Sequence, residues 1–244
     1  MGAIVAEERI VEPEATIRVA EVFRSLQGEG PSLGTPSTFV RLQGCTVGCA
    51  WCDTRYSWPA DGGKAMAWQA LLDSIAAGRA QHIHNVVVTG GEPLEHPDFP
   101  RLVRALKPLG LRIEVETSGV LAPDPVTAAV VDQWNVSLKL CHSGVPDARR
   151  LDPRAIEGFR GIPGERVYWK FVVGAAEHVQ EVADVVRRFD LSRAHVLLMP
   201  LTLGPGGAPD QRGVDELVWH ACVERGYRYT PRAHAAIFGL RRGV

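Results

Sequence analysis

The chemistry of this chain is concentrated in three cysteines, Cys45, Cys49 and Cys52, within the run GCTVGCAWCDT. Thiolates are the metal-binding form of cysteine, and chance alone would rarely place three of them on one short loop. Zinc sites and most iron–sulfur sites use four protein ligands. Three cysteines on a [4Fe–4S] cluster instead leave one iron open to bind a small molecule directly. The C-x3-C-x2-C spacing therefore indicates a cluster with a free coordination position.

The alternative for this loop is a zinc site completed by a fourth residue, either Cys141, Cys222 or a histidine. Cys222 falls on the apolar face of a predicted helix, where we expect a core residue. Cys141 follows the strand-like SLK run, where we expect it to fill space near the mouth of the fold. Neither has a convincing ligand spacing, which favours the three-cysteine interpretation.

A second motif, TGGEP, begins at Thr89 and follows the buried strand-like run NVVV. Gly90 and Gly91 permit a close approach of the backbone to a ligand, and Glu92 is expected to add a carboxylate at the mouth. Glycine turns after strands are common, so the motif alone is a modest signal. Its position, one strand–helix unit after the cysteine loop, makes it informative.

Strand-like and helix-like segments alternate about six times after the cysteine loop. Such alternation predicts parallel strands with helices packed outside them. Before it, residues 16–26 are predicted to form a strand, and residues 65–80 after it are predicted to be helical throughout. The elements therefore predict an α/β fold.

Polar residues recur where the predicted strands end. In a parallel barrel these ends converge on one mouth, where ligands bind. Any one such residue could simply terminate a strand, but the set together favours a shared ligand site. The set comprises Thr89, Glu92, Glu116, Thr117, Ser118, Ser137 and Lys139.

Composition limits the remaining possibilities. The chain has 244 residues, 45% of them hydrophobic, and we expect residues 1–14 to be a flexible lead-in and residues 15–244 to form one domain. A net charge of −1 gives no electrostatic case for nucleic-acid or membrane binding. Five unevenly spaced cysteines argue against a disulfide framework and favour a reducing compartment. No signal peptide or run of about 18 apolar residues is found, so we expect a cytoplasmic protein.

With these motifs in this order, the chain resembles the radical SAM superfamily. The resemblance implies a partial TIM-like barrel of about six parallel strands with outer helices, preceded by extra strand structure. It also implies that the open iron binds S-adenosylmethionine (SAM) and that the GGEP turn contacts the SAM amino group. One-electron reduction then splits SAM into methionine and a 5′-deoxyadenosyl radical, which removes a hydrogen atom from the substrate.

Within the superfamily, the chain is similar to the 7-carboxy-7-deazaguanine synthase family. The runs SLQGEG, WCDT, ETSG, SLKL and KFVV carry this likeness, which extends from about Glu21 to the end of the sequence. The family contracts a ring of 6-carboxy-5,6,7,8-tetrahydropterin, giving 7-carboxy-7-deazaguanine and ammonia in 7-deazapurine (queuosine-type) biosynthesis. SAM is regenerated and Mg²⁺ assists.

The family resemblance also assigns roles to individual residues. Cys45, Cys49 and Cys52 hold the cluster, and Thr54 binds Mg²⁺. The residues implied to bind SAM are Gly90, Gly91, Glu92, Ser137 and Lys139. The residues implied to bind substrate are Leu26, Gln27, Gly28, Glu29, Arg41, Thr89 and His234. Simpler alternatives are a surface salt bridge for Arg41, a backbone-bonded hydroxyl for Ser137 and a structural role for His234.

Several features depart from the family pattern or leave alternatives open. Leu138 replaces a common proline, Leu201 stands where a polar residue is usual, and the sequence continues past Gly239. Another radical SAM enzyme, such as an activase or a different heterocycle synthase, should lack SLQGEG and the threonine after CD. A non-catalytic iron–sulfur or zinc protein would not need the glycine turn. A homodimer and a flavodoxin or ferredoxin-like reductant are implied by the resemblance alone.

Overall fold

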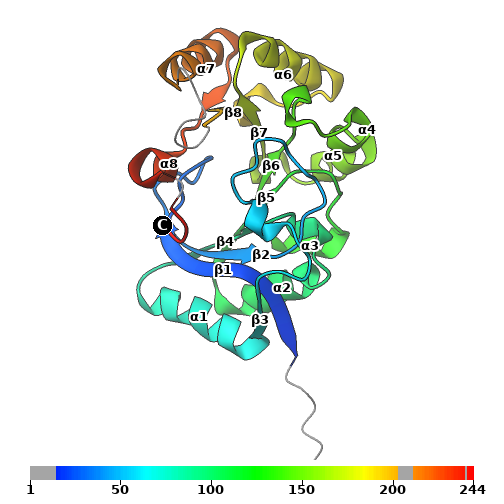
Figure 1. The fold of residues 1–244 in the computed structure, drawn as a ribbon. Coiled ribbons are helices and arrows are strands. Elements are labelled where there is room, and N and C mark those ends of the chain that lie inside the picture. The colour runs from blue at the N-terminus through cyan, green and yellow to red at the C-terminus, as the bar shows by residue number, and fades with distance from the viewer. Residues whose placement is uncertain (1–14, 203–210, 240) are drawn as a thin grey trace, which may run out of the picture.

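A nine-stranded sheet forms the frame of the computed structural model, which describes residues 15–202, 211–239 and 241–244. The strand order is β3-β1-β2-β4-β5-β6-β7-β8-β9; β1 runs antiparallel to β2 and β3, and the other neighbours are parallel. The sheet curls around an interior that faces the cysteine loop (Figure 1). The strands are β1 (Thr16–Leu26), β2 (Pro36–Leu42), β3 (Lys64–Ala67), β4 (Asn85–Gly90), β5 (Arg112–Thr117), β6 (Gln133–Ser137), β7 (Val167–Val173), β8 (Val196–Pro200) and β9 (Arg228–Tyr229).

Helices cover the outer face of this sheet (Figure 1). Strand β4 is apolar at Val86–Val88, which are fully buried because both faces of the sheet are covered there, whereas β5 and β6 alternate apolar residues with polar ones such as Glu114 and Asn135. The helices are α1 (Trp68–Ala80), α2 (Phe99–Leu106), α3 (Pro125–Val130), α4 (Asp147–Arg150), α5 (Pro153–Arg160), α6 (Ala176–Arg188), α7 (Gln211–Arg225) and α8 (Ala233–Phe238). None of the helices within the described residues is long and apolar enough to cross a membrane.

The predicted partial barrel with outer helices is confirmed, and β1 has the predicted bounds. Cys222 lies in the core, as expected. The helical prediction for residues 65–80 is wrong at its start, because residues 64–67 pair with β1 as an edge strand before α1 begins. Long-range pairing outweighs local helix propensity there. The predicted lead-in, residues 1–14, lies outside the described residues, and the single domain stays a prediction.

The turn after β4 packs directly against the start of the cysteine loop. The Gly91 amide donates to the Leu42 carbonyl at 3.2 Å, and the Glu92 amide donates to the Gly44 carbonyl at 3.0 Å. A Cβ atom on Gly91 would lie 2.2 Å from the Gly44 oxygen and 2.5 Å from the Cys45 Cβ. Glycine is therefore needed so that two backbones can touch, whatever ligand lies above them.

We expect Gly91→Ala to lower the free energy of unfolding by about 1–3 kcal/mol, because the added methyl group collides with a backbone carbonyl. Chemical denaturation of the cluster-free protein measures this change. Gly161→Ala is the matched control, since its added Cβ would meet nothing closer than 3.6 Å. Equal stability of the two variants would contradict the close backbone contact.

Candidate active site

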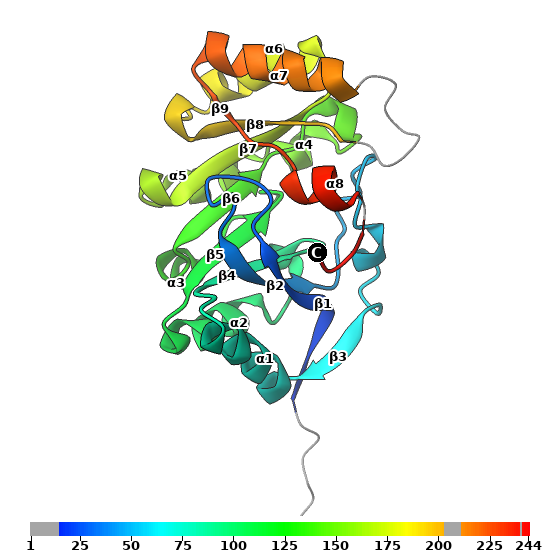
Figure 2. The same cartoon turned by 90° about the vertical axis from the view of Figure 1, so that its left-hand side faces the viewer.

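A cavity of about 410 Å³ opens where the parallel strands end. The helix α8 lies beside the turn that joins β1 to β2 (Figure 2), and its residue His234 lines this cavity. Fifteen of the sixteen sequence-predicted site residues line the cavity, and Glu92 is the exception. They are Leu26, Gln27, Gly28, Glu29, Arg41, Cys45, Cys49, Cys52, Thr54, Thr89, Gly90, Gly91, Ser137, Lys139 and His234.

The three cysteines share one wall of the cavity. Cys49 is buried, and together with the partly buried Cys45 and Cys52 it packs on a small apolar cluster that includes Val120 and Val145. The Trp58 indole N–H donates to the Cys52 sulfur at 3.3 Å, so a hydrogen-bond donor is already in place for a metal-binding thiolate at this position. Burial raises the pKa of Cys45 to about 11, so a metal must displace a proton to bind there.

The arrangement of the thiols suits a cluster better than a single ion. Zinc needs its cysteine sulfurs about 2.3 Å from one point. Across residues 15–202, 211–239 and 241–244, no three His, Cys, Asp or Glu side chains are placed to hold one metal ion. Cys141 is exposed, and the Cys222 thiol donates to the Arg228 carbonyl away from the cavity. A [4Fe–4S] cluster fits this wall because each cysteine binds a different iron.

Lys139 places a cation beside the cysteine wall. Its ammonium donates to the Ser137 carbonyl at 2.7 Å and to the Ser137 hydroxyl at 3.0 Å, and it lies 5.6 Å from the ring of Trp51. Burial lowers the pKa of Lys139, and its side chain forms no salt bridge within the described part of the chain. A desolvated ammonium with only neutral acceptors favours an anionic ligand. Leu138, which stands where the family pattern has a proline, points away from the cavity into the core. Its neighbours Ser137 and Lys139 both line the cavity.

The side chain of Glu92 is not at the mouth, which corrects the expectation of a free carboxylate there. It is fully buried and accepts from the Thr117 hydroxyl at 2.6 Å, the Leu94 amide at 3.1 Å and the Ser118 amide at 2.7 Å, besides the Ser118 hydroxyl. These bonds join the turn after β4 to the end of β5. That the backbone of this turn, rather than the Glu92 side chain, contacts SAM stays a prediction.

Gln27 lies in the cavity lining, but its side chain is committed to the protein. Its amide nitrogen donates to Glu114 at 2.8 Å and to Glu116 at 3.0 Å, while its oxygen accepts from the Glu29 amide. Both amide protons therefore hold carboxylates in place. Glu116, which the sequence placed only among strand-end residues, is the acid that this arrangement directs into the cavity.

Arg41 and Thr89 are partners in register on adjacent strands, which places them at one level of the cavity. The Arg41 Nε donates to Glu21 at 2.8 Å, and the same carboxylate oxygen accepts from the Tyr56 hydroxyl at 2.6 Å. Arg41 therefore forms an ion pair, but both side chains are largely buried and line the cavity, so this is not the surface salt bridge of the simpler alternative. The guanidinium of Arg242 lies 3.5 Å from the centre of the Tyr56 ring.

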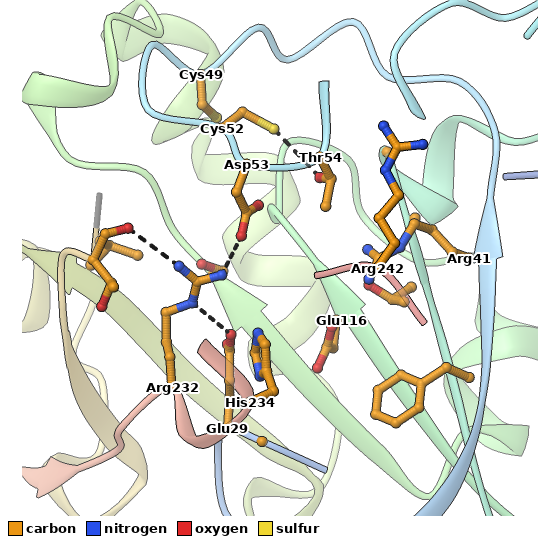
Figure 3. Close-up of a pocket in the computed structure, with 18 of the residues that line it drawn as sticks. Glu29, Arg41, Cys49, Cys52, Asp53, Thr54, Glu116, Arg232, His234 and Arg242 are labelled. Atoms are coloured by element: carbon orange, nitrogen blue, oxygen red, sulfur yellow. Dashed lines mark hydrogen bonds and ion pairs between the residues drawn. The ribbon is translucent and has the colours of Figure 1, made fainter. Parts of the chain in front are cut away.

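A chain of four alternating charges lines the cavity and runs from β7 to the cysteine loop. Lys170 on β7 pairs with Glu29. The other oxygen of Glu29 accepts from the Arg232 Nε at 3.4 Å, and Arg232 pairs in turn with Asp53 (Figure 3). Burial alone would raise the pKa of Glu29, but the cations Lys170 and Arg232 lower it to about 2. Sequence reasoning missed three of these residues. The available signals were the runs WCDT and KFVV, which contain Asp53 and Lys170, and the closing R-x-H pattern, which contains Arg232.

His234 packs against the turn that precedes β2. The Ala233 amide donates to the Gly28 carbonyl at 2.9 Å, and a Cβ on Gly28 would lie 2.2 Å from the His234 ring. The ring lines the cavity, so the structure gives His234 both a packing role and access to a ligand.

Comparisons with known proteins agree with this geometry. A family model described as the Radical SAM superfamily matches residues 39–149. A 7-carboxy-7-deazaguanine synthase from Pyrobaculum aerophilum is 38% identical over 230 residues, covering 93% of this chain and 97% of the relative. One from Hyperthermus butylicus is 37% identical over 232 residues, covering 91% and 92%.

Solved structures share the fold. The crystal structure of QueE from Escherichia coli aligns with a TM-score of 0.69 and 26% identity, covering 90% of this chain and 95% of that one. Streptococcus suis SuiB bound to S-adenosylmethionine aligns with a TM-score of 0.55 and 16% identity over 78% of this chain and 48% of its own. The second likeness supports the fold alone.

We expect Glu29→Gln to lower the free energy of unfolding at neutral pH by about 3 kcal/mol, because two buried cations lose their shared partner. The pKa of Glu29 is lowered from 4.5 to about 2 in the folded protein, so its stabilisation is present above pH 4.5 and is lost as pH falls toward 2. The difference between variant and wild type should narrow over that range in denaturant titrations. Glu157→Gln, which alters an exposed helical pair, should show no such narrowing.

Proposed function

Because the chain belongs to the 7-carboxy-7-deazaguanine synthase family of radical SAM enzymes, we propose that its cavity converts 6-carboxy-5,6,7,8-tetrahydropterin into 7-carboxy-7-deazaguanine and ammonia. The observation that carries the proposal is that one cavity joins three thiols, a wall of arginine and glutamate, and a lysine that has only neutral acceptors among the described residues. A cluster and SAM held there would supply the radical that removes hydrogen from C6 of the pterin.

Residues on the cysteine side would bind and orient SAM. The Lys139 ammonium would pair with the SAM carboxylate, and Ser137, already bonded to that lysine, would fix its direction. The backbone of Gly90 and Gly91 would contact the SAM amino group. These contacts would hold the methionine end against the cysteine wall.

Residues on the other side would bind the pterin. Arg41 uses its Nε on Glu21, and its terminal nitrogens have no hydrogen bond within the described part of the chain, so their fork can take the substrate carboxylate. Glu116 would accept from the amino and ring N–H groups of the pterin. Phe23 and Phe39, stacked with centroids 4.9 Å apart, line the cavity and would keep water from the reacting carbon.

We assign Mg²⁺ to Thr54, whose hydroxyl lies 3.5 Å from the Cys52 sulfur at the cavity wall. Mg²⁺ prefers oxygen ligands and retains substrate or water oxygens, so one protein hydroxyl plus the substrate carboxylate is a reasonable set. A flavodoxin or ferredoxin-like donor would supply the electron. A homodimer and a cytoplasmic location stay predictions from the family resemblance and the composition.

Anaerobic reconstitution with iron and sulfide tests the activity. We expect product after addition of SAM, dithionite, Mg²⁺ and 6-carboxytetrahydropterin, and none from Cys49→Ala, which loses a cluster ligand. Chromatography with mass detection measures product and 5′-deoxyadenosine together. Deoxyadenosine without 7-carboxy-7-deazaguanine would point to a different heterocycle and would refute the proposed substrate.

Thr54→Ala should weaken the stimulation by Mg²⁺ at least several-fold, since the substitution removes the protein oxygen, while iron and sulfide content stay at wild-type levels. Thr54→Ser keeps a hydroxyl and should retain most of the stimulation. Initial rates across a Mg²⁺ series measure the effect. Loss of the cluster in Thr54→Ala would refute the assigned role.

A further inference from the structure

Arg232 connects the two functional halves of the cavity. Its Nε lies 3.4 Å from Glu29 in the turn between β1 and β2, and its terminal nitrogens bond to Asp53 and, at 3.3 Å, to the Thr202 carbonyl. Asp53 stands between the cluster ligand Cys52 and Thr54. A single side chain thus contacts the turn implied in pterin binding and the loop that carries the cysteines.

These contacts are built to hold a fixed distance. The Arg232 side chain is only 10% exposed, and Glu29 is anchored a second time by Lys170 on β7. Bonds from a planar guanidinium to two carboxylates and one neutral carbonyl fix both its position and its orientation. The chain of charges therefore anchors the cluster loop to β7, although Asp53 and Lys170 are far apart in the sequence.

We propose that Arg232 is a positioning residue that sets the separation between the cluster loop and the bound pterin. This inference rests on the proposed function. Hydrogen abstraction is sensitive to the distance between reacting atoms, and a shift of about 1 Å can cost about 100-fold in rate. Arg232 touches neither reacting atom; it fixes the two supports on which the reactants lie.

Arg232→Lys tests this role, because one ammonium keeps the charge but cannot bridge two carboxylates and a carbonyl in the same geometry. We expect product formation to fall 10- to 100-fold with less than a threefold change in KM. The amount of 5′-deoxyadenosine released per product should rise, since SAM would be split without productive transfer. Cluster content should stay at wild-type levels.

Matched variants separate positioning from general stability. Asp53→Asn should show the same excess of deoxyadenosine, and the Arg232→Lys/Asp53→Asn double variant should be no worse than either single variant, because both break one link. Arg212→Lys changes an exposed pair with Glu216 on α7 and should behave as wild type. A wild-type ratio of deoxyadenosine to product in Arg232→Lys, or additive losses in the double variant, would overturn the proposal.

A second readout does not need activity. In the cluster-free protein, Arg232→Lys should accelerate amide hydrogen exchange in both residues 27–35 and residues 45–56, while Arg212→Lys should accelerate neither. Acceleration in one segment only, or in none, would overturn the link. If the wild-type enzyme makes no 7-carboxy-7-deazaguanine, the proposed function fails, but this measurement still decides whether Arg232 joins the two segments.

Discussion

The contact between the glycine turn after β4 and the first residues of the cysteine loop is the constraint on which the site depends. Two backbones meet there without side chains between them, joined by amides that donate to Leu42 and Gly44. The buried carboxylate of Glu92 extends the junction to β5 through Thr117 and Ser118. Three strand ends are thereby fixed relative to one another before any cofactor binds, which is the preorganisation a radical reaction needs.

Charge balance determines the rest of the cavity. Acids and bases alternate through Lys170, Glu29, Arg232 and the more exposed Asp53. Each of the first three, largely buried charges therefore has a partner that offsets its desolvation cost. Lys139 differs because its partners are neutral. Since no carboxylate pairs with Lys139 within the described residues, an anionic ligand could supply its counter-charge.

Sequence reasoning identified most of the site because its strongest signals are local. The cysteine spacing, the glycine turn and the polar strand ends such as Ser137 each lie within a few residues, and the parallel topology brings them together. Ion-pair partners that are distant in the sequence could not be predicted. Nothing in the sequence near Arg232 predicts that its partner is Asp53, which is 179 residues away. Lys170 stood out only as a charged residue inside an apolar strand, which does not predict its pair with Glu29. Glu92 was misplaced because a motif gives a residue type at a strand end without showing whether its side chain faces the ligand or the core.

The amide of Gln27 has an evolutionary consequence. It gives one proton to Glu114 and one to Glu116, so no other side chain of its length can replace it without disturbing an acid. A glutamate at this position would put three carboxylates together. A shorter asparagine would leave Glu116 without its donor in the described part of the chain, whereas Glu114 would keep bonds from Asn135 and Arg112. In divergent relatives Gln27 and Glu116 should therefore change together or not at all, which links the connection after β1 to the end of β5.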